Sequence, residues 1–295
     1  GAKGHLEVPN TIEGVVGSRI DALSPPQQLA LKVASVIGRS FELKLLAAVY
    51  PVEQDREDLG RHLDSLRARG FVDQDKVGKT KLFIFHHVIT QEVSYKLMLF
   101  DQRRVIHREI ALWMEDLKKG QSKGFYGLLA HHWSHTDNVK KAYGYLDKAG
   151  ELARRAGAYQ ESADFFSRAL ELADNPDIDE VNRAEDAKRA GWQRKLSDSF
   201  FAMGRGKESA DYASQALATL GRPQPTNERG WKILLFKGAL RQLFHQMVPR
   251  SLVVVQDDDL RQQCMEFSFA SRRLAEIFYY EHAELQMMGT SLLCL

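Results

Sequence analysis

The chain contains 295 residues, of which 44% are hydrophobic and 27% are charged, a balance that is typical of folded globular proteins and argues against disorder. Because 41 basic and 39 acidic residues leave a net charge of only +2, the composition gives no electrostatic reason to expect nucleic acid or an anionic membrane as a partner. The length is sufficient for two domains of ordinary size.

The first residues, the cysteines and the apolar runs indicate the setting of the chain. Residues 1–10 resemble a tag or linker, and we expect the remainder to be a fragment of a longer protein. Cys264 and Cys294 lack a CxxC spacing, so neither a disulfide framework nor a zinc knuckle is indicated. The longest aliphatic run, residues 252–255, is far shorter than the roughly 20 residues of a membrane helix. We therefore expect a reducing, cytoplasmic location and no membrane partner.

The first half of the chain predicts three short helices. One begins at Ser24, where Ser24-Pro25-Pro26-Gln27 has the pattern of a capping box with proline in the first turn, and ends at Gly38. A second covers residues 42–49 and stops before Pro51, and a third runs from residue 55 to residue 69. The buried faces of the first and third helices are expected to carry Leu29, Val33, Val36, Ile37, Leu59, Leu63 and Leu66.

A β-hairpin is expected after the third helix. Residues 71–72 and 81–85 have strand character, and the polar residues 73–80 between them predict a turn. Another helix is predicted over residues 101–117. Three helices followed by a two-stranded wing is the order of a winged-helix domain, so we expect such a domain over residues 11–120.

The hairpin contains the letters of a phosphate-binding loop, Gly78-Lys79-Thr80. A true loop of this kind needs a further glycine five residues before the second one, and a strand before it and a helix after it. Here Asp73 occupies the glycine position, and a predicted strand follows Thr80. The residues therefore favour an ordinary hairpin turn over a nucleotide site.

Residues 121–295 predict a stack of helical pairs. The segments "YQESADFFSRALEL" and "GKESADYASQALAT" repeat one pattern, with turns expected at Gly157 and Gly204. Small side chains at helix crossings and an aromatic residue at the next contact are typical of tetratricopeptide (TPR) repeats, whose usual unit is 34 residues. A third, truncated pair is expected to begin near Arg261, after "GALRQLFHQMVPRS" as a connector. The packing residues are predicted to be Ala149, Gly150, Ala153, Phe166, Ala169, Phe200 and Ala216.

Three histidines, His131, His132 and His135, are placed on one predicted helix. A helical zinc protease would need glutamate after the first histidine and a third ligand elsewhere, but His132 stands in the glutamate position. A packing role beside Trp133 is therefore favoured and no metal is expected, although a metal-dependent hydrolase remains an alternative. No nucleophile or carboxylate pair has a diagnostic spacing, so no catalytic residue is assigned. The arginines of the third helix are matched by acidic residues, which gives no reason to expect nucleic acid.

Two adjacent histidines, His86 and His87, precede the helix that follows the wing, where a structural role is the simplest interpretation. The segments "TIEGVVGSRIDALSPPQQLALKVASVIGRSFELKLLAAVYP", "FIFHHVITQEVSYKLM" and "RRVIHREIALWME" resemble the region after the ATPase core of STAND-class signalling ATPases. The similarity is greatest to multidomain class III adenylyl or guanylyl cyclases that carry ATPase and TPR modules.

This resemblance implies that His87 would contact the phosphates of ADP bound elsewhere in a parent protein. The phosphate-binding loop, the acidic metal-binding strand and the cyclase metal aspartates have no matching positions in this chain. The resemblance thus implies a non-catalytic regulatory and scaffolding fragment, without a cofactor of its own, in a parent that uses ATP or ADP. Its partners would be proteins or neighbouring domains. The repeat region of a STAND-type transcriptional activator is the alternative from this resemblance.

Overall fold

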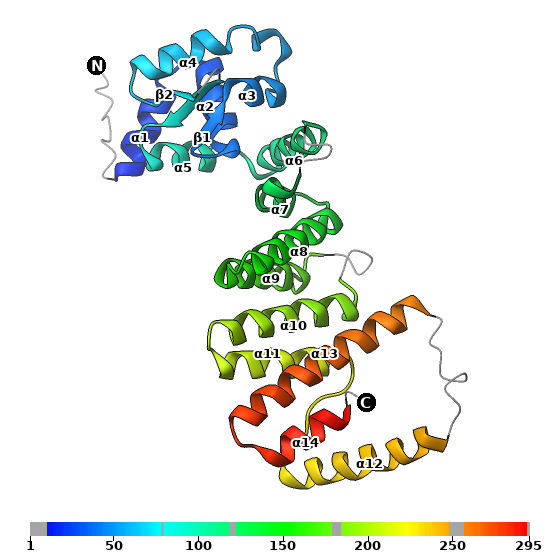
Figure 1. The fold of residues 1–295 in the computed structure, drawn as a ribbon. Coiled ribbons are helices and arrows are strands. Elements are labelled where there is room, and N and C mark those ends of the chain that lie inside the picture. The colour runs from blue at the N-terminus through cyan, green and yellow to red at the C-terminus, as the bar shows by residue number, and fades with distance from the viewer. Residues whose placement is uncertain (1–10, 78–79, 118–121, 179–183, 248–256, 294–295) are drawn as a thin grey trace. The chain divides into compact units, whose positions relative to one another are not determined.

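The computed structural model describes residues 11–77, 80–117, 122–178, 184–247 and 257–293. Within these residues the protein is mainly α-helical, as predicted, and has one small sheet. The chain folds as two compact units, residues 1–138 and residues 139–295, which we describe separately (Figure 1). This division lies beyond the expected boundary at residues 120/121, so α7 (Tyr126–Ser134) belongs to the first unit.

The described part of the first unit contains seven α-helices. The predicted helix from Ser24 is α2, the helix predicted over residues 55–69 is shortened to α4, and the helix predicted over residues 101–117 is α6. Residues 53–55 form a separate 3-10 turn, and α4 begins four residues later than predicted, at Leu59. The helix over residues 12–21 was not predicted. The helices are α1 (Ile12–Asp21), α2 (Pro25–Ile37), α3 (Leu43–Val49), α4 (Leu59–Ala68), α5 (Val88–Lys96), α6 (Phe100–Leu117) and α7.

The sheet corrects the prediction of a two-stranded hairpin. It has three antiparallel strands in the order β1-β3-β2, formed by β1 (Ser40–Glu42), β2 (Val72–Val77) and β3 (Thr80–Phe85). The turn predicted over residues 73–80 was wrong because β2 continues to Val77. Its polar residues Asp73 and Asp75 are exposed, and they are compatible with an edge strand whose backbone pairs only with β3. Gly78 and Lys79 lie outside the described residues.

The core of the first unit forms around α2 and the inner face of the sheet. Leu31 and Val33 of α2 are fully buried, and the rings of Phe41 and Phe83 stack with centroids 5.9 Å apart. The capping interaction predicted for α2 is present, because the backbone N–H of Ser24 donates to Oε1 of Gln27 at 3.3 Å. Hydrophobic burial and a local cap therefore specify the same helix.

The described part of the second unit contains three helical hairpins and one additional helix (Figure 1). Its helices α8 and α9, α10 and α11, and α13 and α14 form the hairpins, and the first two pairs are stacked in chain order. The helices are α8 (Val139–Arg155), α9 (Tyr159–Ala173), α10 (Asp186–Ala202), α11 (Gly206–Thr219), α12 (Glu228–Met247), α13 (Asp258–Tyr280) and α14 (Glu284–Leu293).

The three hairpins turn in the same way. Gly157, Gly204 and His282 have φ angles of +77°, +75° and +57°, the left-handed conformation that commonly ends a helix. In each turn the next N–H donates back to a carbonyl of the preceding helix, as in Ala158 N to Ala153 O at 2.9 Å. The glycines were predictable because they remove the steric cost of this conformation. The turn at His282 was not predicted from the sequence, because histidine rarely adopts this left-handed conformation.

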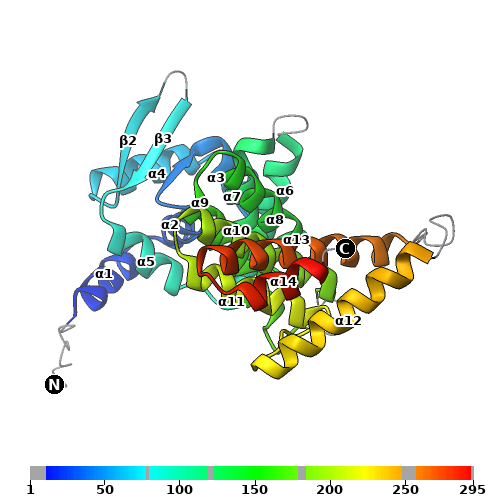
Figure 2. The same ribbon diagram turned by 60° about the horizontal axis from the view of Figure 1, so that its bottom comes forward.

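The third pair begins at Asp258, close to the expected start near Arg261, and it packs directly on its predecessor although α12 separates the two pairs in sequence. Residues 238–247, expected to be part of a connector, lie in α12, and residues 248–251 lie outside the described residues. Helix α13 packs against α10 and α11, whereas α12 packs mainly against α14. The ring of Trp231 on α12 also lies 5.9 Å from that of Phe278 on α13. Figure 2 shows α12 away from α10, with α13 and α14 nearer the stack.

No helix in the described ranges combines the length and the apolar character needed to cross a membrane.

Candidate functional site

His87, the residue predicted to sense nucleotide, lies at the start of α5. It is the N-cap residue, is exposed, and makes no side-chain capping hydrogen bond. The neighbouring His86 is held by the wing, because its Nδ1 lies 2.6 Å from Oδ2 of Asp73, and the two histidine rings are 4.4 Å apart. The structure therefore orients His86 from β2, while the His87 ring lies at a helix N-terminus, where N–H groups favour an anion.

The hairpin next to this position has the wrong geometry for a phosphate-binding loop. Val77 pairs with Thr80, and Thr80 begins strand β3. A strand therefore follows the sequence Gly78-Lys79-Thr80, where a phosphate-binding loop would have a helix. This supports the interpretation of a hairpin turn.

The predicted packing residues of the second unit are all buried. Ala149 and Ala153 lie on α8, Ala169 on α9, Phe200 on α10 and Ala216 on α11. The closest approach is at Gly150, where an added Cβ would lie 2.7 Å from Cζ of Phe166, a residue with no exposed surface. The absent side chain of Gly150 thus provides the space for the ring.

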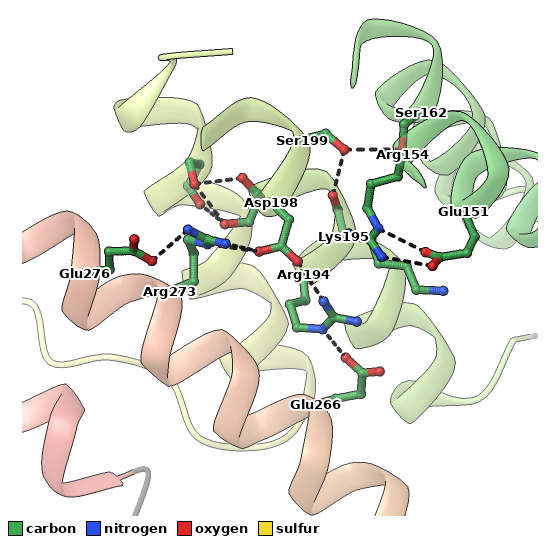
Figure 3. Close-up of polar contacts among 12 residues, drawn as sticks. Glu151, Arg154, Ser162, Arg194, Lys195, Asp198, Ser199, Glu266, Arg273 and Glu276 are labelled. Atoms are coloured by element: carbon green, nitrogen blue, oxygen red, sulfur yellow. Dashed lines mark hydrogen bonds and ion pairs between the residues drawn. The ribbon is translucent and has the colours of Figure 1, made fainter. Parts of the chain in front are cut away.

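A chain of ion pairs joins α10 to α13 (Figure 3). Arg194 bridges two carboxylates, with its Nε 2.5 Å from Oε2 of Glu266 and its Nη1 2.7 Å from Oδ2 of Asp198. Arg273 continues the series, since its Nε donates to Oδ1 of Asp198 at 2.9 Å and its Nη1 donates to Glu276 at 2.7 Å. We call these five residues the α10–α13 ion chain. Sequence analysis missed it because partners more than 70 residues apart leave no local spacing signal.

Similar contacts join α8 to α10. Asp147 accepts hydrogen bonds from Nζ of Lys195 at 2.6 Å and from the indole of Trp192 at 3.0 Å. On α8, hydrogen bonds from Arg154 are the main cause that lowers the pKa of Glu151 to about 2. These charges lie on α8, α10 and α13, which are the first helices of the three hairpins. Most of the charged side chains named on these helices are therefore paired with one another.

Four histidines meet in the first unit, including one that sequence analysis did not single out. His107 of α6 is buried, and its Nδ1 lies 2.9 Å from Nδ1 of His132, which is also buried. His131 is exposed on α7, and His135 is the exposed C-cap residue just after the helix, not within it as predicted. Ligand nitrogens of His107, His131 and His135 all lie within 4.8 Å of one another.

Burial keeps the two inner histidines neutral. Loss of hydration is the main cause that lowers the pKa of His107 to about 2 and that of His132 to about 3, and the neighbouring histidines lower both further. The expected packing role beside Trp133 describes His132 well, because both side chains are buried. It does not describe the exposed His131 and His135.

Comparison with known proteins provides one relative and no family. No known protein-family profile matches the chain. An uncharacterized protein of Rhizobium meliloti (strain 1021) is 27% identical over 163 residues, which are 55% of this chain and 16% of the relative. The matched segment is therefore a small part of a much longer protein, and the relative assigns no activity.

Proposed function

We propose that this chain is a non-catalytic regulatory and scaffolding region of a larger, cytoplasmic, nucleotide-dependent signalling protein, such as a nucleotidyl cyclase with a STAND-type ATPase module. In this proposal the first unit is a winged-helix-like domain and the second is a TPR-like array. The array binds a protein partner or a neighbouring module, and the first unit communicates the nucleotide state of the parent. The chain itself carries neither the phosphate-binding loop nor the catalytic groups.

The observation that carries the proposal is the way in which the second unit is packed. Gly150 admits the buried ring of Phe166 at a helix crossing, and small residues occupy the neighbouring contacts. Glycine turns close the first two hairpins in the same conformation. Stacked helical pairs with small residues at their crossings are typical of arrays that present an extended protein-binding surface.

The position of His87 supports a sensing role for the first unit. Its ring is exposed at the N-cap of α5, while Asp73 holds the adjacent His86. A phosphate group from an adjoining module would meet both an imidazole and the free N–H groups of a helix terminus there. Release of this contact on nucleotide exchange would shift the equilibrium between two arrangements of the parent, by an amount set by the differential affinity of the ligand.

The length of the R. meliloti relative also supports a role within a larger protein. The segment similar to this chain is 16% of that relative, so most of the relative consists of other sequence. A region of this kind is well suited to connect modules. The internally neutralised faces of α8, α10 and α13 would then keep the array rigid while its remaining surface is available to a partner.

Calorimetric titration of the purified chain with MgATP and with MgADP tests the assignment of the nucleotide chemistry to other modules. We expect no saturable binding with a dissociation constant below about 100 µM, because the described hairpin continues into a strand. The variant Lys79→Ala should behave identically. Micromolar binding that Lys79→Ala abolishes would contradict the proposal and restore the phosphate-binding loop.

A further inference from the structure

We propose that His107, His131 and His135 form a binding site for a divalent late transition-metal ion, with Zn²⁺ as the most suitable ion. The site would hold the ion through three imidazole nitrogens and leave one coordination position open to a pocket beside α5. The inference depends only on the geometry of the first unit and is independent of the proposed regulatory function.

The three side chains converge from separate parts of the fold. His107 comes from the middle of α6, whereas His131 lies on α7 and His135 at its end. Ring centroids of His107 and His135 are 4.4 Å apart, those of His131 and His135 4.6 Å, and those of His107 and His131 5.7 Å.

The separations are close to those that a bound ion requires. Zinc–nitrogen bonds of about 2.0 to 2.1 Å in tetrahedral geometry place two ligand nitrogens about 3.3 Å apart. The corresponding nitrogens lie within 4.8 Å of one another in this structure, so closure by roughly 1 to 1.5 Å is sufficient. Because His131 and His135 are exposed, modest side-chain rotations can provide this closure without repacking the core.

The hydrogen bond of His135 leaves its other ring nitrogen available to the ion. Nδ1 of His135 lies 2.8 Å from the carbonyl oxygen of His131, and a carbonyl can only accept, so this nitrogen carries the proton and Nε2 keeps its lone pair. Both ring nitrogens of His107 have partners, with Nδ1 2.9 Å from Nδ1 of His132 and Nε2 3.1 Å from the hydroxyl of Tyr95, so coordination through Nε2 would replace the contact with Tyr95. A hydrogen bond to the second ring nitrogen is the usual support for a metal-binding histidine.

Charges of both signs surround the cluster. Two positive charges oppose an ion, the guanidinium of Arg103, 4.7 Å from the centroid of the Tyr95 ring, and Lys96, which lines the pocket and is paired with Glu13 at 2.8 Å. Glu92 lines the same pocket as the three histidines and provides a compensating negative charge.

The open side of the site faces a pocket of about 320 Å³. Glu92 and Tyr95 of α5 line this pocket together with His107, His131 and His135, so the pocket offers a carboxylate and a hydroxyl to an exchangeable ligand of the ion. Three protein ligands with one open position are typical of zinc sites that bind water or an exchangeable ligand, whereas structural zinc sites usually have four protein ligands. A cluster that served only for packing would not need two exposed imidazoles converging on a cavity.

The test is titration of the chelator-treated chain of 295 residues with ZnCl₂ by calorimetry, and with Co²⁺ by visible absorption. We expect one Zn²⁺ per chain with a dissociation constant below about 1 µM, and Co²⁺ absorption bands typical of tetrahedral coordination. The exposed variants His131→Gln and His135→Gln should each weaken binding at least about tenfold, because each loses a ligand. The variant His62→Gln, which changes a histidine of α4 outside the cluster, should bind like the unchanged chain.

Circular dichroism of each variant checks that it is folded, so the test does not rely on substitution of the buried His107. The unchanged chain should also melt at a higher temperature in saturating Zn²⁺, since an ion that binds the folded state stabilises it. Weaker binding than stated, a stoichiometry other than one, or affinity that either His131→Gln or His135→Gln leaves unaltered overturns the proposal. Equal weakening by His62→Gln overturns it as well, because it would indicate adventitious binding to surface histidines.

Discussion

A single missing methyl group sets the contact between α8 and α9 at Gly150. The backbone there lies so close to Phe166 that a Cβ atom would be 2.7 Å from the ring. Gly144 lies on the same helix and has no heavy atom within 4 Å of an added Cβ. These two glycines therefore separate the effect of packing from that of helix propensity.

We predict opposite effects of alanine at the two positions. Gly144→Ala should stabilise the chain by up to about 1 kcal/mol, because alanine favours a helix over glycine. Gly150→Ala gains the same propensity, but it should destabilise the chain by about 1 to 3 kcal/mol, because the buried ring must move. Urea unfolding measures both free energies.

A second change provides the control for this mechanism. Phe166→Leu removes the ring atoms closest to Gly150, so the cost of Gly150→Ala should be smaller in the Phe166→Leu background than in the unchanged chain. Equal effects of alanine at Gly144 and Gly150 would show that the two helices do not cross at Gly150.

At the scale of elements, the α10–α13 ion chain explains how α13 is attached to a helix far away in sequence. Its two arginines alternate with three carboxylates. The side chains of Arg194 and Arg273 are only 16% and 21% exposed, so loss of a partner would leave a mostly buried charge incompletely paired. Gly191 allows the approach, since an added Cβ would lie 3.3 Å from Glu266.

We expect Asp198→Ala to destabilise the second unit by about 1 to 3 kcal/mol, between the values for exposed and fully buried ion pairs. Arg273→Ala in the same background should cost less than it does alone, because its main partner is already absent. A double-mutant cycle measured by urea unfolding quantifies this coupling. As a control, Lys232→Ala, which removes an exposed pair with Glu228 on α12, should leave the free energy of unfolding unchanged. A coupling energy near zero between Asp198 and Arg273 would show that α13 is held by its apolar contacts alone.

At the scale of the whole molecule, each unit has a hydrophobic core of its own. The core of the first unit extends over α1 to α6, including Ile20, Leu31 and Ile110. A separate cluster in the second unit includes Ala213 of α11 and Leu274 of α13. Independent cores are a condition for independent folding.

We therefore predict that the pieces 1–138 and 139–295 each fold when produced alone. The division falls between α7 and α8 and interrupts no described helix. The sum of their circular dichroism spectra should match that of the whole chain, and each piece should melt cooperatively. A piece that is unfolded by itself would show that the boundary at residues 138/139 does not separate two folding units.

Much of the fold could be predicted because its signals are local. The cap at Ser24, the apolar period of α6 and the glycine turns at Gly157 and Gly204 each depend on residues within a few positions of one another. Likewise, the repeated small residues of the second unit indicated its buried positions without knowledge of their partners. The winged-helix and TPR-like assignments and the role of His87 stay predictions.

The sequence by itself determined the mainly helical class and most helix positions, since backbone conformation responds to neighbouring residues. Only the tertiary structure decided which distant residues meet. Strand β1 exists because β3 offers it a partner, α13 reaches α10 through charges more than 70 residues apart, and His107 joins His131 and His135 across two helices. Such contacts depend on how elements pack, and packing leaves no fixed spacing in the sequence.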